Sequence, residues 1–238
     1  MPSWREDYLY RLTQSAGTEE QVFTELANIM SEIGFEYCSL GVRSPVVGRT
    51  PRESWSTTYP PDWQSLYHGQ NYMTIDPVID AALRSPVPIC WSDKLFTHQR
   101  PFWEEARAHG VCHGWTLAMH GRCGEMGLIS LARSATSLSA AELDETEAKL
   151  VWVSHAANGV IANLAAQKNP PKMARDLTER EREVLRWTSL GKTSSEIGII
   201  LGITTRTINF HVTTILVKLD AVNKTQAVVK AVMLDLMY

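Results

Sequence analysis

The sequence predicts an α+β domain, in which an antiparallel sheet lies between helical layers (an α/β/α sandwich), followed by a small all-α domain. Three observations predict this arrangement. Runs that open with helix-capping sequences stand near both ends of the first 165 residues, and strand-like runs lie between them. Pro170 and Pro171 then interrupt the helical pattern, in a stretch without apolar periodicity. Only helical runs with capping sequences follow these prolines.

Capping sequences and strand-like runs place the elements of the first domain. Thr18 and Gln21 form a capping box that opens one helix, and Ser139 with Glu142 opens a long helix before the linker. The first domain is predicted at 1–165, its strands at 35–42, 53–59, 113–120 and 126–134, a short helix at 101–110, and the linker at 166–176.

The composition describes an ordinary globular protein of 238 residues, with 44% hydrophobic and 21% charged residues. No apolar run approaches the roughly 18–20 residues that a membrane span needs. The first residues lack the basic and apolar regions of a signal peptide. The four cysteines are irregularly spaced, which disfavours a disulfide framework. These features predict a cytoplasmic protein without membrane contact.

Charge is divided unevenly along the chain. Residues 170–238 hold 10 Lys and Arg against 7 Asp and Glu, a net charge of +3, and the remaining residues carry −6. A basic domain joined to an acidic one indicates an anionic partner for the basic part.

Residues 177–238 have the pattern of a helix-turn-helix. Capping boxes of the form Thr-x-x-Glu open the first and second helices, and Gly191 and Gly202 suit their ends. Thr204 can cap a third helix that runs to about Leu219. Two short helices joined by a glycine-containing turn are typical of this DNA-binding motif.

The third helix is predicted to read DNA. An apolar stripe with helical spacing faces the other helices, so the N-terminal half of the opposite side is free to enter a major groove. Arg can read guanine and Asn adenine, whereas Thr and Lys reach phosphates. The stripe is Ile208, Val212, Ile215 and Leu219, and the predicted DNA-binding residues are Thr205, Arg206, Asn209, Thr213 and Lys218.

Two apolar residues of the third helix, Phe210 and Val217, lie off its stripe. We therefore predict that neighbouring helices hold the third helix from more than one side. The alternative for the whole segment is a helical bundle whose polar face is only solvated.

The order of residues at 177–219 resembles the helix-turn-helix of LuxR-type regulators. The matches include Leu177-Thr178-x-Arg180-Glu181, Gly191-Lys192-Thr193 and Phe210-His211-Val212. With this resemblance Lys192 joins the predicted DNA-binding residues, double-stranded DNA is the expected partner, and RNA polymerase is a further candidate. Asn209 departs from the family, in which many relatives carry a basic residue at this position.

Asp76 stands in apolar surroundings, between Ile75 and the run Pro77-Val78-Ile79. An aspartate is rarely buried unless a partner answers its charge. One explanation is a ligand that donates a hydrogen bond to the carboxylate. The other is a helix N-cap, with Pro77 in the first turn. Both can hold, because a carboxylate has two oxygens.

The phrases "GFEYCSLGVRSP" and "FWEEARAHGVCHGW", together with the aromatic residues around Asp76, give the N-terminal region a family likeness. It resembles the acyl-homoserine-lactone-binding domain of LuxR-family quorum-sensing receptors. This implies a lactone ligand, no cofactor, and a homodimer on a two-fold-symmetric DNA site. The pocket residues implied by position are Tyr59, Trp63, Tyr67, Asp76, Trp91, Trp103 and Gly114.

Each expected role follows from what the side chain can donate or accept. Asp76 accepts from the ligand's amide N–H, Trp63 donates to the lactone carbonyl, and Tyr59 donates to the acyl carbonyl. For any one aromatic residue alone, core packing is the more common explanation. The remaining assignments are apolar walls for Tyr67, Trp91 and Trp103, the acyl chain for Leu128 and Ile129, and assistance to Tyr59 from Ser39 or Ser130.

Other chemistries are disfavoured. The cysteines and histidines Cys112, His113, His120 and Cys123 match no standard zinc spacing, and strand alternation separates neighbours. There is no nucleophile elbow, no paired carboxylates in an enzyme-like context, and no acidic pocket of a phosphorylated receiver. The sequence therefore predicts a ligand-responsive regulator and no enzyme. Two alternatives stay open: a lactone-independent DNA-binding regulator, and an inhibitor of related regulators through mixed dimers.

The last predicted helix, within "NKTQAVVKAVMLDLMY", carries a narrow stripe of small residues. Such a stripe lets two helices approach closely, which favours a dimer contact. The alternative is packing on the preceding helices. The stripe consists of Ala227, Val228, Ala231 and Val232.

Overall fold

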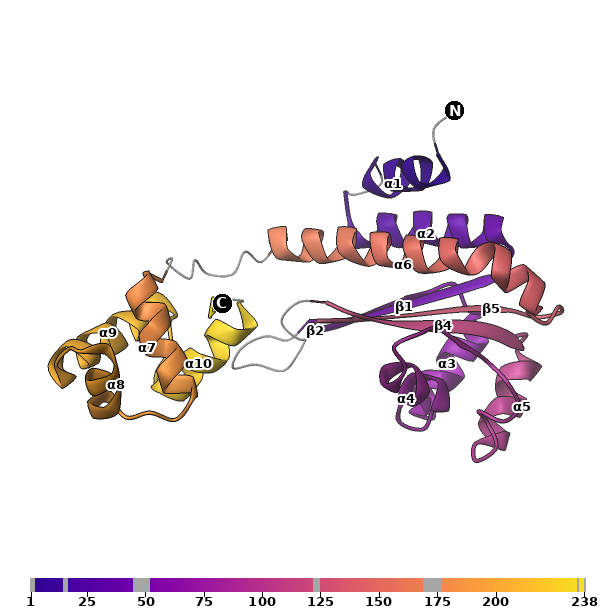
Figure 1. Ribbon diagram of the computed structural model, residues 1–238. Helices are drawn as coiled ribbons and strands as arrows, with labels where there is room; N and C mark the ends of the chain where they lie inside the picture. Colours follow the sequence, from indigo (N-terminus) through magenta and orange to yellow (C-terminus); the bar gives the residue numbers. More distant parts are fainter. Residues whose placement is uncertain are drawn as a thin grey trace. The chain divides into compact units, whose positions relative to one another are not determined.

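The computed structural model describes residues 3–14, 17–44, 52–121, 125–168, 177–234 and 236–237. The described chain forms two compact units (Figure 1). The first contains a sheet with helices on both faces, and the second contains only helices. Most of the linker predicted at 166–176 lies outside the described residues.

A five-stranded antiparallel sheet forms the middle layer of the first unit. It consists of β1 (Tyr37–Ser44), β2 (Arg52–Thr57), β3 (Ile89–Cys90), β4 (His113–His120) and β5 (Met126–Arg133), in the order β2-β1-β5-β4-β3. All strands except β3 coincide with predicted segments. The two residues of β3 are too few to show a period in sequence. The predicted α+β fold with an antiparallel sheet is confirmed.

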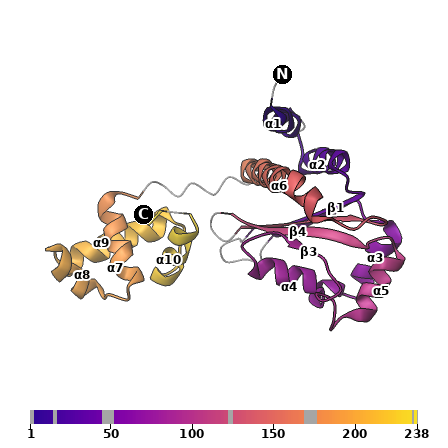
Figure 2. The ribbon, with the colours of Figure 1, turned by 45° about the vertical axis from the view of Figure 1, so that its right-hand side comes forward.

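Helices α2 (Glu19–Ile33) and α6 (Ala140–Lys168) cover one face of the sheet, and α1 (Trp4–Gln14) lies outside them (Figures 1 and 2). An aliphatic core fills the space between these helices and the sheet. Its fully buried members include Leu26, Ile29, Ile129, Leu131 and Leu150.

The helix caps predicted for this layer are present. The Thr18 hydroxyl accepts a hydrogen bond from the Gln21 backbone N–H at 3.2 Å, and Gly34 ends α2 in the left-handed region with φ 112°. The Ser139 hydroxyl accepts from the Glu142 backbone N–H, also at 3.2 Å. These contacts are local in sequence, which is why the sequence could predict them.

Three α-helices and a 3-10 helix cover the opposite face of the sheet: α3 (Pro61–Gly69), η1 (Tyr72–Thr74), α4 (Pro77–Arg84) and α5 (Arg100–Ala108) (Figures 1 and 2). This layer has an aromatic core, in contrast to the aliphatic core on the other face. Its buried aromatic residues are Trp63, Phe96, Phe102 and Trp103.

The second unit consists of α7 (Glu179–Ser189), α8 (Ser194–Leu201), α9 (Thr205–Lys218) and α10 (Lys224–Met233). Both predicted capping boxes are formed at the starts of α7 and α8. α8 and α9 meet at 111°, within the range of a helix-turn-helix. No single helix in the described part of the chain is long and apolar enough to cross a membrane; only the bent α8–α9 pair, taken together, meets that length and composition.

Candidate functional site

A cavity lies in the first unit between the sheet and the aromatic layer. It is concave and mainly apolar, with a few polar groups, as small-molecule sites are. β1, β2 and β5 contribute one wall, and α3, α4 and α5 contribute the other. Nine of the eleven residues predicted at the ligand line it: Ser39, Tyr59, Trp63, Tyr67, Asp76, Trp91, Trp103, Leu128 and Ser130.

Gly114, one of the two that do not line the cavity, lies beneath the cavity wall. A Cβ atom at Gly114 would lie 2.4 Å from the Trp91 ring, so only glycine lets the ring lie against β4. The Trp91 backbone N–H also donates to the Gly114 carbonyl at 2.8 Å. Gly114 therefore positions Trp91 without lining the cavity itself.

Asp76 uses both carboxylate oxygens. Oδ1 accepts from the Val78 backbone N–H at 2.8 Å and caps α4, as the second explanation predicted. Oδ2 accepts from the Tyr67 hydroxyl at 2.9 Å. Burial raises the pKa of Asp76 to about 6, and these two hydrogen bonds oppose only part of the rise. Tyr67, predicted only as an apolar wall, is therefore also a polar partner.

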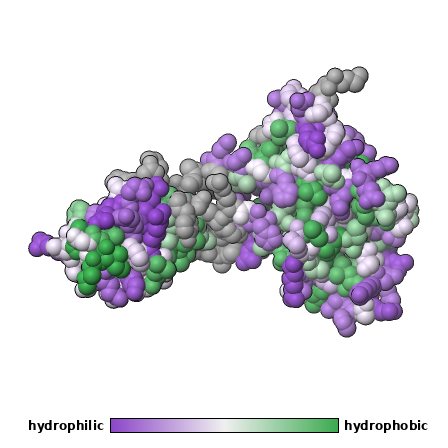
Figure 3. Space-filling view, viewed as in Figure 1, coloured by the Kyte–Doolittle hydropathy of each residue, from purple (hydrophilic) through white to green (hydrophobic). Residues whose placement is uncertain are grey.

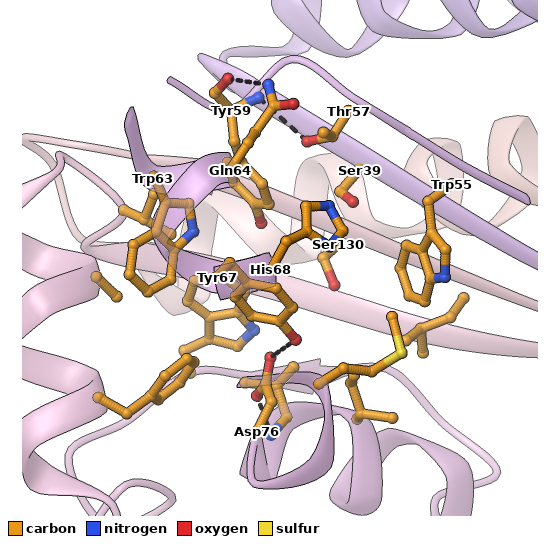
Figure 4. A pocket seen from close by; sticks show the side chains of 18 of the residues that line it. Ser39, Trp55, Thr57, Tyr59, Trp63, Gln64, Tyr67, His68, Asp76 and Ser130 are labelled. Carbon is orange, nitrogen blue, oxygen red and sulfur yellow. Dashed lines mark hydrogen bonds between the residues drawn. The ribbon is translucent and has the colours of Figure 1, made fainter. Parts of the chain in front are cut away.

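Two hydrogen-bond donors of the cavity have no partner. Neither the Tyr59 hydroxyl nor Trp63 Nε1 has a hydrogen-bond partner among the described residues, although Trp63 is only 3% exposed. Figure 4 shows both groups turned toward the cavity, across from Asp76. Burial also raises the pKa of the Tyr59 hydroxyl, which keeps its proton in place. The cavity therefore presents two hydrogen-bond donors across from one carboxylate acceptor.

A short hydrogen-bonded chain orders the sheet side of the cavity. Trp91 Nε1 donates to Thr116 Oγ1 at 2.9 Å, and Thr116 Oγ1 lies 2.9 Å from Ser130 Oγ. The Trp91 N–H is thereby satisfied, which fits its predicted role as a wall. Ser130 Oγ and Ser39 both face the cavity (Figure 4). Each hydroxyl keeps capacity for a further hydrogen bond.

Several lining residues were not predicted, and one prediction was wrong. Trp55 lines the cavity from β2, and its ring lies over Gly41 of β1, where a Cβ atom would come within 2.6 Å. Ile129 instead points into the aliphatic core on the other face of the sheet, because neighbours on a strand alternate. The missed residues are Trp55, Thr57, Gln64, His68, Met73, Val78, Ile79, Phe96, Phe102, Ala106 and Val111.

A second, mainly apolar hollow, which we call the extension, adjoins the cavity along the sheet. It is lined by Gly41, Val42, Leu83 and Met126, and also by the charged residues Arg43 and Glu53. It shares Trp55, Met73, Ile79 and Leu128 with the first cavity. The shared residues form an apolar boundary between the cavity and the extension, whereas Asp76 lines the cavity alone.

Of the four residues weighed as zinc ligands, Cys123 lies outside the described residues. His113 and His120 stand at opposite ends of β4. Cys112 Sγ donates to the Arg107 carbonyl at 3.6 Å.

The predicted DNA-binding residues of α9 are mostly exposed. Thr205, Arg206, Asn209 and Thr213 are accessible. Lys192, at the turn before α8, keeps an exposed side chain, with Glu196 as an ion-pair partner at 3.6 Å.

Lys218 is the exception. Its Nζ lies 2.6 Å from Oε2 of Glu181, and these side chains are only 18% and 5% exposed. Its ammonium therefore neutralises a buried carboxylate of α7, and we do not retain the phosphate contact predicted for it. No sequence pattern indicates a pairing between residues 37 positions apart.

The packing prediction for α9 was wrong, and the dimer contact predicted for α10 stays a prediction. Phe210 and Val217 are each 67% exposed, so no neighbouring helix holds α9 from their side. In α10, Ala227 and Ala231 are buried in the unit's own core, whereas Val232 is 55% exposed. Half of the small-residue stripe thus serves intramolecular packing, as the alternative stated.

Comparisons with known proteins match both the first and the second unit to known families. Residues 18–160 match the family described as "Autoinducer binding domain", and residues 175–231 match "Bacterial regulatory proteins, luxR family". The chain is 36% identical over 239 residues to the transcriptional activator protein AnoR of Acinetobacter nosocomialis, with both chains fully covered.

Solved structures extend this similarity to the whole fold. A crystal structure of Escherichia coli SdiA has a TM-score of 0.76 at 34% identity, and covers 99% of this chain and 98% of its own. SdiA in complex with octanoyl-rac-glycerol has a TM-score of 0.73 at 33% identity, covering 98% and 97%.

Proposed function

Because the chain belongs to the LuxR family of bacterial transcriptional regulators, we propose that it binds an acyl-homoserine lactone in the cavity of the first unit. The lactone-bound protein then binds a two-fold-symmetric DNA site as a homodimer. The observation that carries the proposal is the opposition of one carboxylate acceptor to two unpartnered donors inside one apolar cavity.

The polar end of the cavity fits the head of a lactone. Its amide N–H donates to Asp76, its lactone carbonyl accepts from Trp63, and its acyl carbonyl accepts from Tyr59. Both donors line the open cavity and are not among the buried unpaired atoms of the described residues, so the ligand carbonyl groups take up hydrogen bonds that no protein group makes, each with a net value of about 1 kcal/mol. Ser39 and Ser130 are placed to assist at the carbonyl groups.

The apolar end fits an acyl chain. We place the chain past Leu128, Ile79 and Met73 toward Trp55, into the extension beyond them. Each buried methylene contributes about 0.8 kcal/mol, which favours chains long enough to reach the extension.

The second unit supplies the DNA contact. The N-terminal half of α9 enters a major groove, where Arg206 and Asn209 meet base edges and Lys192 lies near the backbone. Arg206 makes no ion pair within the described part of the chain, so its charge is available to DNA.

A glycerol monoester is a second candidate ligand, because a relative's structure contains one. Its hydroxyl groups can donate to Asp76 as an amide N–H does, and its ester carbonyl can accept from Trp63 or Tyr59. Both ligand classes share the acyl chain.

The test compares thermal stability and DNA binding of the full chain with a series of acyl-homoserine lactones, with octanoylglycerol, and with neither. We expect stabilisation and DNA binding with a lactone of suitable length. Full DNA binding without any ligand would support the lactone-independent alternative. Ligand binding without DNA binding would support the inhibitor of related regulators. If only octanoylglycerol stabilises the protein, the ligand is a glycerol ester and not a lactone.

A further inference from the structure

Phe210 occupies the outer face of α9 without a place in the unit's core. The buried residues of α9, such as Ile208 and Val212, define its inner side. At 100° per residue, Phe210 falls on the side opposite to them, between Arg206 one turn earlier and Thr213 one turn later. A 67% exposed phenyl ring thus stands in the middle of the face that a helix-turn-helix presents to the major groove.

The threonines around Phe210 make this face still less polar. Thr213 Oγ1 donates to the Asn209 carbonyl at 3.0 Å, and Thr214 Oγ1 donates to the Phe210 carbonyl at 3.1 Å. Each hydroxyl has a single proton, and both protons are used within the helix. Figure 3 shows hydrophobic surface over the α8–α9 end of the unit. The two threonine hydroxyls therefore have no proton left to donate to DNA, and the Phe210 ring between them offers only apolar contact.

We propose that Phe210 reads a thymine in each DNA half-site through the 5-methyl group of that base. The thymine methyl is the one apolar group that base edges present in the major groove, and phenylalanine is among the side chains that can contact it. The proposal rests on the DNA binding proposed above, and it adds a specificity-determining residue that hydrogen-bond readout does not include.

DNA is favoured over a protein partner by the position of the ring. Phe210 lies in the N-terminal half of α9, which meets base edges in helix-turn-helix complexes. Val217 is equally exposed at 67%, but it lies seven residues further on, about 10 Å along the helix axis. It therefore provides a matched control on the same face.

The experiment uses the full chain, the acyl-homoserine lactone that stabilises it most in the series above, and a duplex selected from a random library. Each thymine of the selected duplex is replaced singly by uracil, which removes only the methyl group. We expect one thymine in each half-site at which uracil weakens binding about fourfold, the fold-change that corresponds to one buried methyl group. Phe210→Ala should abolish this sensitivity at that position, and Val217→Ala should retain it.

Uracil tolerated at every thymine would overturn the proposal, and so would unchanged sensitivity in Phe210→Ala. Phe210→Ala that keeps the uracil response but loses transcriptional activity would assign the ring to a protein partner and overturn the proposal as well. If the wild-type chain with lactone selects no duplex, the proposed function itself fails. Tolerance of uracil by a chain that does select DNA removes this inference alone.

Discussion

The ionisation of Asp76 links ligand affinity to pH. Burial raises its pKa to about 6, so the folded chain holds this proton at pH values where the unfolded chain has released it. This group's contribution to stability therefore falls as pH rises from about 4 to about 6. A ligand that donates an N–H to the carboxylate favours the ionised form, so its affinity should change in the opposite direction.

We predict that lactone binding is about tenfold weaker at about pH 5 than at about pH 7, because a group with a pKa near 6 is about one-tenth ionised at the lower pH. Asp76→Asn should bind weakly at both pH values, because the charge-assisted hydrogen bond is lost. Isothermal titration calorimetry checks both expectations. Equal wild-type affinity at the two pH values would show that the Asp76 carboxylate does not take part in ligand recognition.

A substitution at Trp63 can separate the contribution of its indole N–H from that of its packing. Trp63→Phe keeps an aromatic ring against Tyr67 and Phe102, at 5.7 and 5.8 Å between ring centroids, but removes the indole N–H. We expect a loss of about 1 kcal/mol in lactone affinity with little change in the stability of the empty protein. Fluorescence-detected or calorimetric titration measures the affinity, and a thermal melt measures stability. A large stability loss with unchanged affinity would identify Trp63 as core only.

At this scale the sequence predicted which polar side chains share a cavity better than it predicted the shape of the walls. Asp76, Tyr59 and Trp63 line one cavity, as the family resemblance implied, and their roles toward a ligand stay predictions. Gly114 and Trp55 show what was missed. Each depends on a ring lying flat over a glycine of a strand, and such a contact needs the strand neighbours to be known.

Among the elements, α7 and α9 are joined by one buried ion pair. Glu181 Oε2 accepts from Lys218 Nζ at 2.6 Å and from the Thr178 backbone N–H at 2.7 Å. Burial acts to raise the pKa of Glu181, but these hydrogen bonds outweigh it, and the pKa lies below its ordinary value. Removal of the cation leaves a buried carboxylate without its counter-charge.

We predict that Lys218→Met destabilises the second unit by about 3–5 kcal/mol, whereas Lys192→Met, at an exposed ion pair, costs less than about 1 kcal/mol. Lys192→Met should instead flatten the salt dependence of DNA binding by about one charge. Urea denaturation and DNA titration at several salt concentrations test the pair of variants. If Lys218→Met is as stable as the wild type and the salt dependence of its DNA binding is flatter, Lys218 contacts a phosphate as the sequence predicted.

Helix boundaries were predictable and helix orientation was not. The caps at Thr18, Thr178 and Thr193 are contacts within three residues, which sequence patterns record directly. Which side of α9 faces solvent depends on contacts with helices elsewhere in the unit. For that reason Phe210 was predicted to be packed and is exposed.

Across the whole molecule, each unit has its own buried core, and the cavity belongs to the first unit alone. Ligand binding energy therefore enters the stability of the first unit directly. At a free lactone concentration of about 100 times the dissociation constant, the linkage contributes roughly 2.7 kcal/mol to that unit. The stability of the second unit rises only by the part of this free energy that coupling between the units transmits.

We predict that saturating lactone without DNA slows hydrogen exchange in β5, α3 and α4 by up to about a hundredfold, and leaves the slowest amides of α7 and α9 unchanged. The reason is that amides exposed only by unfolding of the first unit gain the whole linkage energy. Hydrogen–deuterium exchange read by mass spectrometry separates the two sets of peptides. Asp76→Asn at the same lactone concentration is the control, and its protection should fall with its affinity. Equal protection of α7 and α9 would show that the two units unfold together. Lactone binding would then favour DNA binding by stabilising the second unit, not by promoting dimer assembly.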